Sequence, residues 1–372
     1  MRRILDGENI RAILYGAAFL STGAGGTLNT GLRILDDLEK EGGVSLELIT
    51  PDEMEEDGYA ATVIGYGSPD VFLNTAFGAD AQYAFDGMRA TLAREGKKLS
   101  AIYSVELAGF NTMTPIYVAV KNHMPLLDVD CNGKAFPTFE KSLYTVRGGL
   151  TTPICMGGGQ GDYIHFVPGD PMDFDTADRV IHKVCEVYEK IGLGTCVIPA
   201  DKVASLTIPG MITLAEQVGR IVLDNIGKFA SGGADADGRG LIRGIRSVTD
   251  GRTREICRGR IVRLEKAASA AYNKGTVVIE NEPDGRRFYV DFKNENLLIR
   301  DGSKVIATVP ETICTYFADT GEPVTNSELS EGMRIGICVV PAPQEWWERE
   351  GGFGMYRSML EEMGYTGEAV RL

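Results

Sequence analysis

The sequence predicts a two-domain protein in which an N-terminal α/β layered domain precedes a β-rich (α+β) C-terminal domain. The first observation is length, because 372 residues exceed the roughly 250–300 that one hydrophobic core usually serves. The second is an alternation of strand-like and helical patterns in the first half of the chain. The third is a succession of short strand-like runs with turn dipeptides after residue 256. We therefore place residues 1–168 in the first domain and residues 169–372 in the second.

Helices and strands alternate in the first domain. Apolar residues at helical spacing predict helices over residues 9–20 and 28–39, on either side of a glycine-rich turn. Further strands and helices follow in turn. The predicted strands cover residues 44–49, 61–65, 99–105, 126–130 and 163–167, and the predicted helices cover residues 79–94 and 113–122. This order is typical of an α/β layered domain.

The second domain begins after a turn signal at Pro168-Gly169-Asp170-Pro171. Two helices, over residues 176–191 and 213–229, are predicted to open it. Residues 231–240 are small, polar and glycine-rich, which predicts a mobile loop. An antiparallel region then follows, with strands predicted over residues 276–280, 288–292, 297–299, 305–309 and 334–340.

Composition excludes several classes of function. Fifty-two acidic against 38 basic residues give a formal net charge of −14, which repels nucleic-acid phosphates and anionic membrane surfaces. The seven cysteines are scattered and form no C-x-x-C pair, which is typical of reduced thiols in a cytosol. The N-terminus reaches charged residues before any apolar run of signal-peptide length. We therefore expect a cytoplasmic protein with no nucleic-acid or membrane partner.

The turn between the first two predicted helices contains Gly23, Gly25 and Gly26. Its backbone amides are suited to holding an anion or a substrate oxygen at the start of the second helix. No strand precedes the turn, so the glycine fingerprint of dinucleotide-binding proteins is excluded. The alternative is a tight helix crossing that needs glycine for its backbone conformation. Both interpretations stay open at the level of sequence.

Three carboxylates follow neighbouring strand-like runs. Glu106 ends one apolar run, and Asp128 and Asp130 end the next. Because ligands of open α/β sheets bind beyond the carboxyl ends of the strands, we expect the three side chains to converge. On an extended strand, residues two apart point to the same face, where a pair of acids can share a proton, bind a cation or position water. The alternative is a pair of acids that caps the turn at Asn132-Gly133.

Other chemistry finds little support in the sequence. Among only three histidines, His165 alternates with apolar residues and is placed to reach a site from a strand end. The G-x-S-x-G, Walker A and H-E-x-x-H patterns are absent. A divalent metal, zinc or magnesium, is a possible cofactor that the sequence does not require. Its candidate ligands are Glu106, Asp128, Asp130 and His165.

Several short motifs, spread over nearly the whole chain, resemble the S-methyl thiohydantoin desulfurase family. The N-terminal motifs are Thr22-Gly23-Ala24-Gly25-Gly26, Glu106 with Gly109-x-Asn111, and Asp128-x-Asp130-x-x-Gly133-x-Ala135-Phe136-Pro137. The C-terminal motifs are Asn294-Glu295-Asn296, Val309-Pro310 and Thr320-Gly321-Glu322-Pro323. The resemblance implies an α/β domain followed by a β-rich domain. It also implies a hydrolase in which water replaces the methylthio group of a five-membered ring, giving a hydantoin and methanethiol.

For such a reaction we assign general-base or metal-ligand roles to Asp128 and Asp130, with Glu106 as a further carboxylate of the site. We expect Asn111 to donate a hydrogen bond to the ring. We expect the amides of Gly23, Gly25 and Gly26 to hold an oxygen of the substrate. Lys134 is a further candidate for substrate binding, at a position where the family usually has arginine.

Two alternatives to this enzyme remain. The first is a non-catalytic partner subunit of a hydantoinase- or oxoprolinase-like enzyme, proteins with which many relatives are associated. The second is a hydrolase of a related cyclic imide or lactam. Convergence of Glu106, Asp128 and Asp130 in a closed pocket would favour an enzyme, and their dispersal on the surface would favour a partner subunit. We also expect a homo-oligomer.

Overall fold

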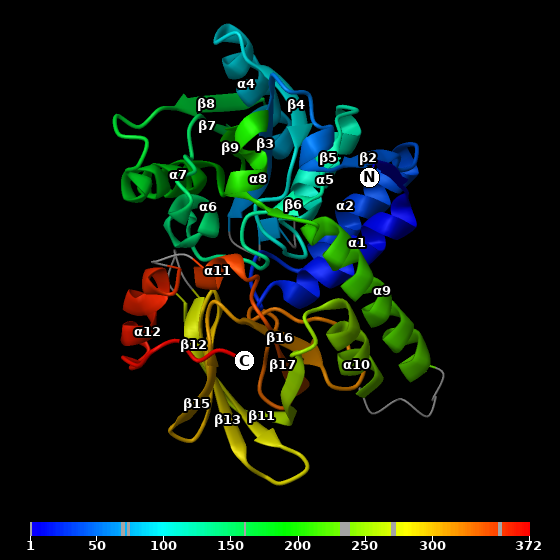
Figure 1. The fold of residues 1–372 in the computed structure, drawn as a ribbon, viewed down its shortest axis with the longest axis vertical. Coiled ribbons are helices and arrows are strands. Elements are labelled where there is room, and N and C mark those ends of the chain that lie inside the picture. Colours follow the sequence, from blue (N-terminus) through cyan, green and yellow to red (C-terminus); the bar gives the residue numbers. More distant parts are fainter. Residues whose placement is uncertain are drawn as a thin grey trace.

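The computed structural model describes residues 2–67, 71–72, 75–159, 161–230, 239–268, 273–348 and 352–372. Figure 1 shows an N-terminal layered region with a mixed sheet above a curled, antiparallel sheet. The predicted fold class is therefore confirmed. Most of the loop predicted over residues 231–240 lies outside the described residues.

An eight-stranded sheet forms the centre of the N-terminal region. Its four inner strands β2, β5, β4 and β3 are parallel, and the strands on either side of them join antiparallel. Parallel neighbours need long crossover connections, which explains the helices between these strands. The order across the sheet is β1 (Arg3–Leu5), β2 (Leu46–Ile49), β5 (Leu126–Leu127), β4 (Lys98–Ile102), β3 (Gly58–Gly67), β9 (Lys190–Pro199), β7 (Ile154–Gly158) and β8 (Asp162–Phe166).

The helices predicted in the first half of the chain are confirmed. Asp6 caps α1 by accepting the Asn9 amide, and Thr27 caps α2 by accepting the Thr30 amide. The helices and short turns of this region are α1 (Gly7–Leu20), α2 (Leu28–Glu41), η1 (Pro51–Glu53), α4 (Ala79–Arg94), α5 (Met113–Lys121), η2 (Phe139–Lys141), α6 (Leu143–Val146), α7 (Phe174–Tyr188) and α8 (Ala200–Leu206).

The sheet also contains three strands, β1, β7 and β9, that the sequence did not predict. The helix predicted over residues 176–191 ends at Tyr188, and β9 begins at Lys190. Strand β9 contains glycines, which are typical of loops in sequence. A Cβ on Gly192 would lie 2.2 Å from the carbonyl oxygen of Asp80 in α4. Close packing of a helix on the sheet therefore requires glycine here. The N-terminal sheet consequently continues well past residue 168.

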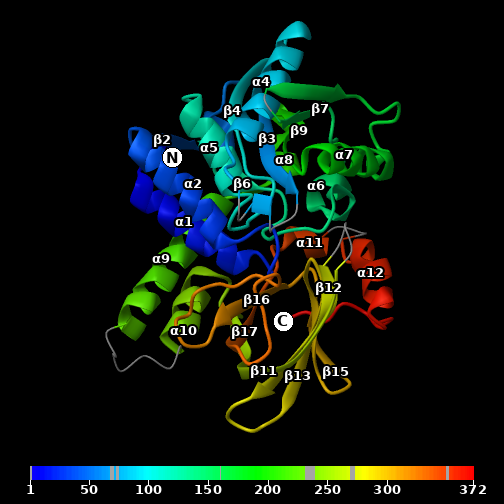
Figure 2. The same cartoon turned by 180° about the vertical axis from the view of Figure 1, so that it is seen from behind.

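Helix α9 (Met211–Ala230) packs directly against α1, as Figures 1 and 2 show from opposite sides. A Cβ on Gly16 would lie 1.7 Å from the carbonyl oxygen of Ala215. A Cβ on Gly219 would lie 1.7 Å from that of Ala12. The two backbones thus approach as closely as glycine allows, and α9 closes one side of the N-terminal region.

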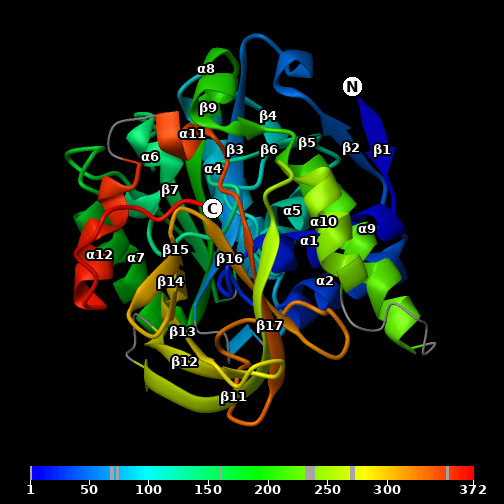
Figure 3. The ribbon, with the colours of Figure 1, turned by 60° about the horizontal axis from the view of Figure 1, so that its bottom comes forward.

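The C-terminal region is a seven-stranded antiparallel sheet that curls on itself (Figure 3). Strand β16 was not predicted, because its start follows the turn-like residues Pro310 and Glu311. The strands in spatial order are β15 (Lys304–Thr308), β14 (Glu295–Asp301), β13 (Arg287–Lys293), β12 (Asn273–Asn281), β11 (Arg254–Ala268), β17 (Arg334–Val340) and β16 (Thr312–Phe317). The accompanying helices are α10 (Arg239–Val248), α11 (Glu345–Glu348), η3 (Gly354–Tyr356) and α12 (Arg357–Glu362).

One apolar core runs across both regions. It joins Leu14 of α1 and Val218 of α9 to Cys314 and Tyr316 of β16 and to Trp346 of α11. Three further cores lie within single regions: one between the first sheet and α7, a small one between that sheet and α4, and one inside the curled sheet. Because the largest core is shared, the two regions pack against each other through one continuous apolar core.

Candidate functional site

Two of the predicted carboxylates lie together at the carboxyl edge of the parallel strands. Glu106 follows β4, and Asp130 ends the short strand β6 (Val129–Asp130), which pairs with β10 (Ile208–Pro209). Their exposed fractions are 4% and 0%. The Asn132 side-chain amide donates to the carbonyl oxygen of Val105 at 3.2 Å and ties the two segments together.

The Glu106 carboxylate is held by two donors. Asn111 Nδ2 donates to Oε1 at 2.7 Å, and the Phe136 amide donates to Oε2 at 3.2 Å. Asn111 is itself fixed, because its Oδ1 accepts the Gly65 amide of β3 at 3.1 Å. Burial raises the pKa of Glu106 to about 7, although both hydrogen bonds act in the opposite direction. Glu106 is therefore an oriented carboxyl group that changes charge near neutral pH.

One carboxyl oxygen of Asp130 accepts hydrogen bonds and the other has no partner among the described residues. Its Oδ1 accepts the amides of Asn132, at 2.7 Å, and Gly133. Its Oδ2 is buried and has no hydrogen-bond partner among the described residues. Burial raises the pKa of Asp130 to about 8, against the effect of the two amides, and the nearby Glu106 charge raises it further. A proton on Oδ2 would therefore be retained at neutral pH and have no acceptor within the described chain.

Asp128 does not join these two carboxylates. Its Oδ1 accepts the Thr213 amide at 2.9 Å and its Oδ2 accepts the Thr213 hydroxyl at 2.5 Å, at the start of α9. The extended run breaks at Asp128, because β5 belongs to the large sheet whereas β6 pairs with β10. The spacing of two therefore does not place Asp128 and Asp130 on one face, and the carboxylate of Asp128 caps a helix.

The glycine turn lies against the Glu106 segment. Gly23, Gly25 and Gly26 all have positive φ, at 80°, 72° and 83°. A Cβ on Gly25 would lie 2.2 Å from the Cβ of Ala108 and 3.4 Å from Glu106 Oε1. The Gly25 carbonyl accepts the Asn111 amide at 3.2 Å. The turn thus packs over the carboxylate, and the positive φ angles agree with the predicted need for glycine backbone conformation; the role of its amides in holding a substrate oxygen stays a prediction.

Lys134 is buried and paired with a residue that sequence reasoning did not assign to the site. Its Nζ donates to Glu295 Oε2 at 2.6 Å, and both side chains are 0% exposed. In the sequence, Glu295 lies in a polar stretch between two strand-like runs, which is also typical of a turn. Only its membership of a family motif set it apart. A contact between residues 161 positions apart is not visible in local patterns.

His165 lies far from the carboxylate pair. His165 is exposed on β8, opposite Cys155 and four strand positions from β4, so it is remote from Glu106. Within the described ranges, no group of three or more His, Cys, Asp or Glu side chains is placed to hold a metal ion. The four predicted metal ligands are accordingly not assembled as one donor set.

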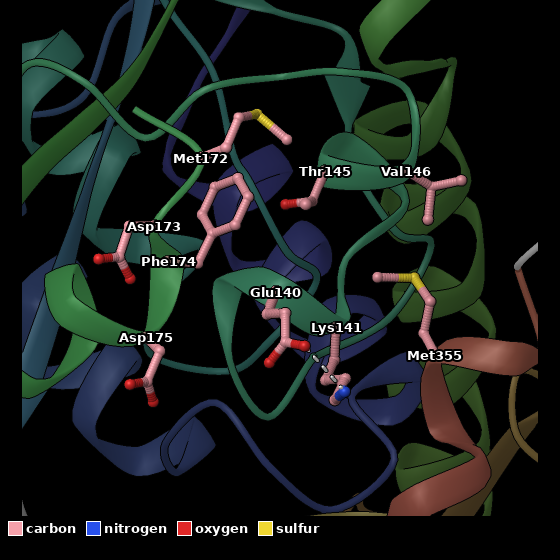
Figure 4. A pocket seen from close by; sticks show the side chains of 9 residues that line it. All are labelled: Glu140, Lys141, Thr145, Val146, Met172, Asp173, Phe174, Asp175 and Met355. Carbon is pink, nitrogen blue, oxygen red and sulfur yellow. Dashed lines mark hydrogen bonds and ion pairs between the residues drawn. The ribbon is translucent and has the colours of Figure 1, made fainter. Parts of the chain in front are cut away.

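Two surface cavities lie apart from the predicted site residues. The larger, of about 620 Å³, has an apolar wall and three acids at its edge, as Figure 4 shows. It is lined by Glu140, Lys141, Thr145, Val146, Met172, Asp173, Phe174, Asp175 and Met355. The smaller, of about 310 Å³, lies between α2 and Phe77. Neither includes Glu106 or Asp130, and both of these side chains are buried.

Fold and site together describe a class of two-domain proteins with a buried carboxylate pair where an α/β region meets a curled β region. The chain belongs to the S-Me-THD-like family: residues 8–167 match the model of its N-terminal domain and residues 173–354 match that of its C-terminal domain. The suspected family is thereby confirmed. The two matches meet near residue 168, whereas β9 of the N-terminal sheet lies within the second match.

A similar solved structure is an X-ray crystal structure of a protein from Chromobacterium violaceum, with a TM-score of 0.84. The two chains are 20% identical and each is covered completely, which shows a shared fold. No curated protein matches the chain significantly. Of the described helices, none combines the length and the hydropathy that a membrane span needs.

Proposed function

We propose that this protein hydrolyses a small five-membered cyclic amide-type heterocycle, as an S-methyl thiohydantoin desulfurase does. Water would replace the methylthio group and give a hydantoin and methanethiol. The observation that carries the proposal is the buried pair of Glu106 and Asp130, whose pKa values are raised to about 7 and about 8. Membership of the S-Me-THD-like family supports the reaction class.

In this proposal the two carboxyl groups divide acid and base catalysis. Glu106 takes a proton from the attacking water, while Asn111 and the Phe136 amide hold its carboxylate in place. Asp130 stays protonated, and its unpartnered Oδ2 gives the proton to the departing sulfur. A carboxylate held by two donors beside a carboxyl group with one unpartnered oxygen is suited to these two roles.

The step balances without another reactant. The water oxygen bonds to the ring carbon as the carbon–sulfur bond breaks, and the electron pair of that bond leaves with sulfur. One water proton goes to Glu106, and the other passes from the new oxygen to the ring nitrogen. Glu106 then returns its proton to Asp130. Zinc or magnesium remains a prediction from the sequence, and no step here passes through a metal.

The burial of Glu106 and Asp130 near each other supports an enzyme over a non-catalytic partner subunit, while Asp128, the third predicted carboxylate, lies apart from them. A protein that only binds an enzyme has no need for two buried ionisable groups with raised pKa values. A hydrolase of a related cyclic imide or lactam would use the same groups. The two enzymes are therefore distinguished by measuring which cyclic substrates the protein turns over, and not by their site residues.

Thiol release from an S-methyl thiohydantoin, followed with a chromogenic thiol reagent, tests the proposal. The protein should first be analysed for bound metal and then assayed with and without added zinc or magnesium. We expect release that falls at least about 100-fold in Glu106→Gln and Asp130→Asn, since each change removes one partner of the proton transfer. The exposed Glu56→Gln is the matched control. Unchanged release in both folded site variants would refute the assignment.

The pH profile provides a second test. Activity should rise as Glu106 loses its proton near pH 7 and fall as Asp130 loses its proton near pH 8. Because the two groups interact, the limbs report the pair rather than either residue alone. A profile that is flat from about pH 6 to about pH 9 would contradict the proposed roles.

A further inference from the structure

We infer that Glu295, from the C-terminal region, is a positioning residue for the carboxylate site: through Lys134 and Thr22 it holds the two segments that enclose Glu106. This inference rests on the proposed function for its kinetic readout. It predicts in addition a titration that can be measured without any substrate. Nothing in the sequence assigns this role, because Glu295 lies 189 positions from Glu106.

Lys134 has no donor left for a substrate. A lysine ammonium has three N–H donors. Here Nζ donates to Glu295 Oε2 at 2.6 Å, to the carbonyl oxygen of Ala135 at 3.0 Å and to the Tyr356 hydroxyl at 2.9 Å. The predicted role of Lys134 in substrate binding would require breaking one of these bonds inside the protein. Its contacts instead connect the Asp130–Pro137 segment to the C-terminal region.

Glu295 also reaches the glycine turn. Its Oε2 lies 3.1 Å from the Thr22 hydroxyl, and the next residue, Asn296, donates its amide to the Thr22 carbonyl at 2.8 Å. Thr22 has a φ of 56°, a left-handed conformation that a threonine adopts only when its surroundings hold it. Asn326 adds a third contact, because its amide donates to the Gly23 carbonyl at 2.9 Å. The C-terminal region therefore fixes the turn that covers Glu106.

The charges of Lys134 and Glu295 also affect the pKa of Glu106. The Lys134 charge lowers the pKa of Glu106, whereas the Glu295 charge raises it. The charge of Glu106 in turn raises the pKa of Asp130. Burial raises the pKa of Glu295 itself, and the Lys134 ammonium opposes that effect. Removal of one partner leaves an uncompensated charge beside Glu106, with a sign that depends on which partner is lost.

The test compares Glu295→Gln and Lys134→Met. We expect the acidic limb of the pH profile of kcat to move to lower pH by roughly one unit in Glu295→Gln, because a negative charge near Glu106 is lost. We expect it to move to higher pH by a similar amount in Lys134→Met, because a positive charge is lost. Opposite movements are a readout that simple loosening of the fold would not produce. The double variant should return the limb toward its original position.

The matched control is Glu311→Gln. Glu311 is another fully buried glutamate of the C-terminal region, and it accepts the amides of Ala342 and Leu372. Its replacement should lower stability without moving the limb. The inference would be overturned if, in folded Glu295→Gln and Lys134→Met, the acidic limb of the pH profile of kcat stayed in place or moved in the same direction.

A titration separates this inference from the proposed function. The Glu106 carboxyl is followed by ¹³C NMR of protein labelled at glutamate, with its signal assigned from Glu106→Gln. If no thiohydantoin is turned over, but the Glu106 titration still moves in opposite directions in the two variants, the proposed function fails and the positioning role stands. If turnover is found but the titration is unmoved by either variant, the positioning role fails and the proposed function stands.

Discussion

The strongest prediction concerns the dependence of stability on pH in Glu106→Gln. Burial raises the pKa of Glu106 from 4.5 to about 7 in the folded protein. The folded state therefore holds a proton that the unfolded chain releases, so this contribution is complete below about pH 4.5 and is lost as pH rises toward 7. At ~1.4 kcal/mol for each pKa unit, the loss is roughly 3 kcal/mol. Asp130, raised from 3.8 to about 8, produces a loss of the same sign.

Urea unfolding at a series of pH values from about 4.5 to about 8.5 measures the effect. Glutamine cannot ionise, so Glu106→Gln should lose roughly 3 kcal/mol less stability than the parent protein across this range. The exposed Glu56→Gln should follow the parent curve. Parallel curves for Glu106→Gln and the parent would show that Glu106 is not held neutral by burial, and the division of acid and base roles would lose its support.

Three further predictions follow from the geometry. Asn111→Ala removes the donor that orients Glu106 and should lower kcat roughly 10- to 100-fold, whereas an unchanged kcat would contradict this positioning. Asp128→Asn weakens the cap on α9 and should cost about 1 kcal/mol in urea unfolding while thiol release persists; complete loss of release in the folded variant would return Asp128 to the site. Gly219→Ala should lower stability by several kcal/mol, since its Cβ would lie 1.7 Å from a backbone oxygen. Gly227→Ala, on the same helix with open space around it, should be neutral or stabilising in the same assay.

Local patterns predicted elements that depend on local physics. The apolar spacing over residues 79–94 predicted α4 with the bounds that it has, because one face of this helix packs on the sheet. The rule that ligands bind at the carboxyl ends of parallel strands placed Glu106 and Asp130 in one neighbourhood. Their catalytic roles remain predictions.

Patterns failed where tertiary packing decides. The two-residue repeat of a strand predicted that Asp128 and Asp130 point to the same face. The strand instead breaks at Asp128, whose carboxylate accepts a hydrogen bond from Thr213 of α9. Strand β9 was missed because Gly192 and Gly194, which suit close packing on α4, are typical of loops in isolation. The contact of Lys134 with Glu295 joins two distant segments, and no local signal in either of them specifies a partner.

The position of β9 has a consequence for the order in which the chain can fold. Strand β9 lies between β3 and β7, yet it follows both in sequence by dozens of residues. During synthesis, β3 can pair with β4 and β7 with β8, but the edges of β3 and β7 that face β9 stay open until residue 199 has left the ribosome. A fragment cut at the junction of the two family matches would lack β9 as well as α9. We expect such a fragment to aggregate, because the smallest unit that completes the first sheet includes the beginning of the second match.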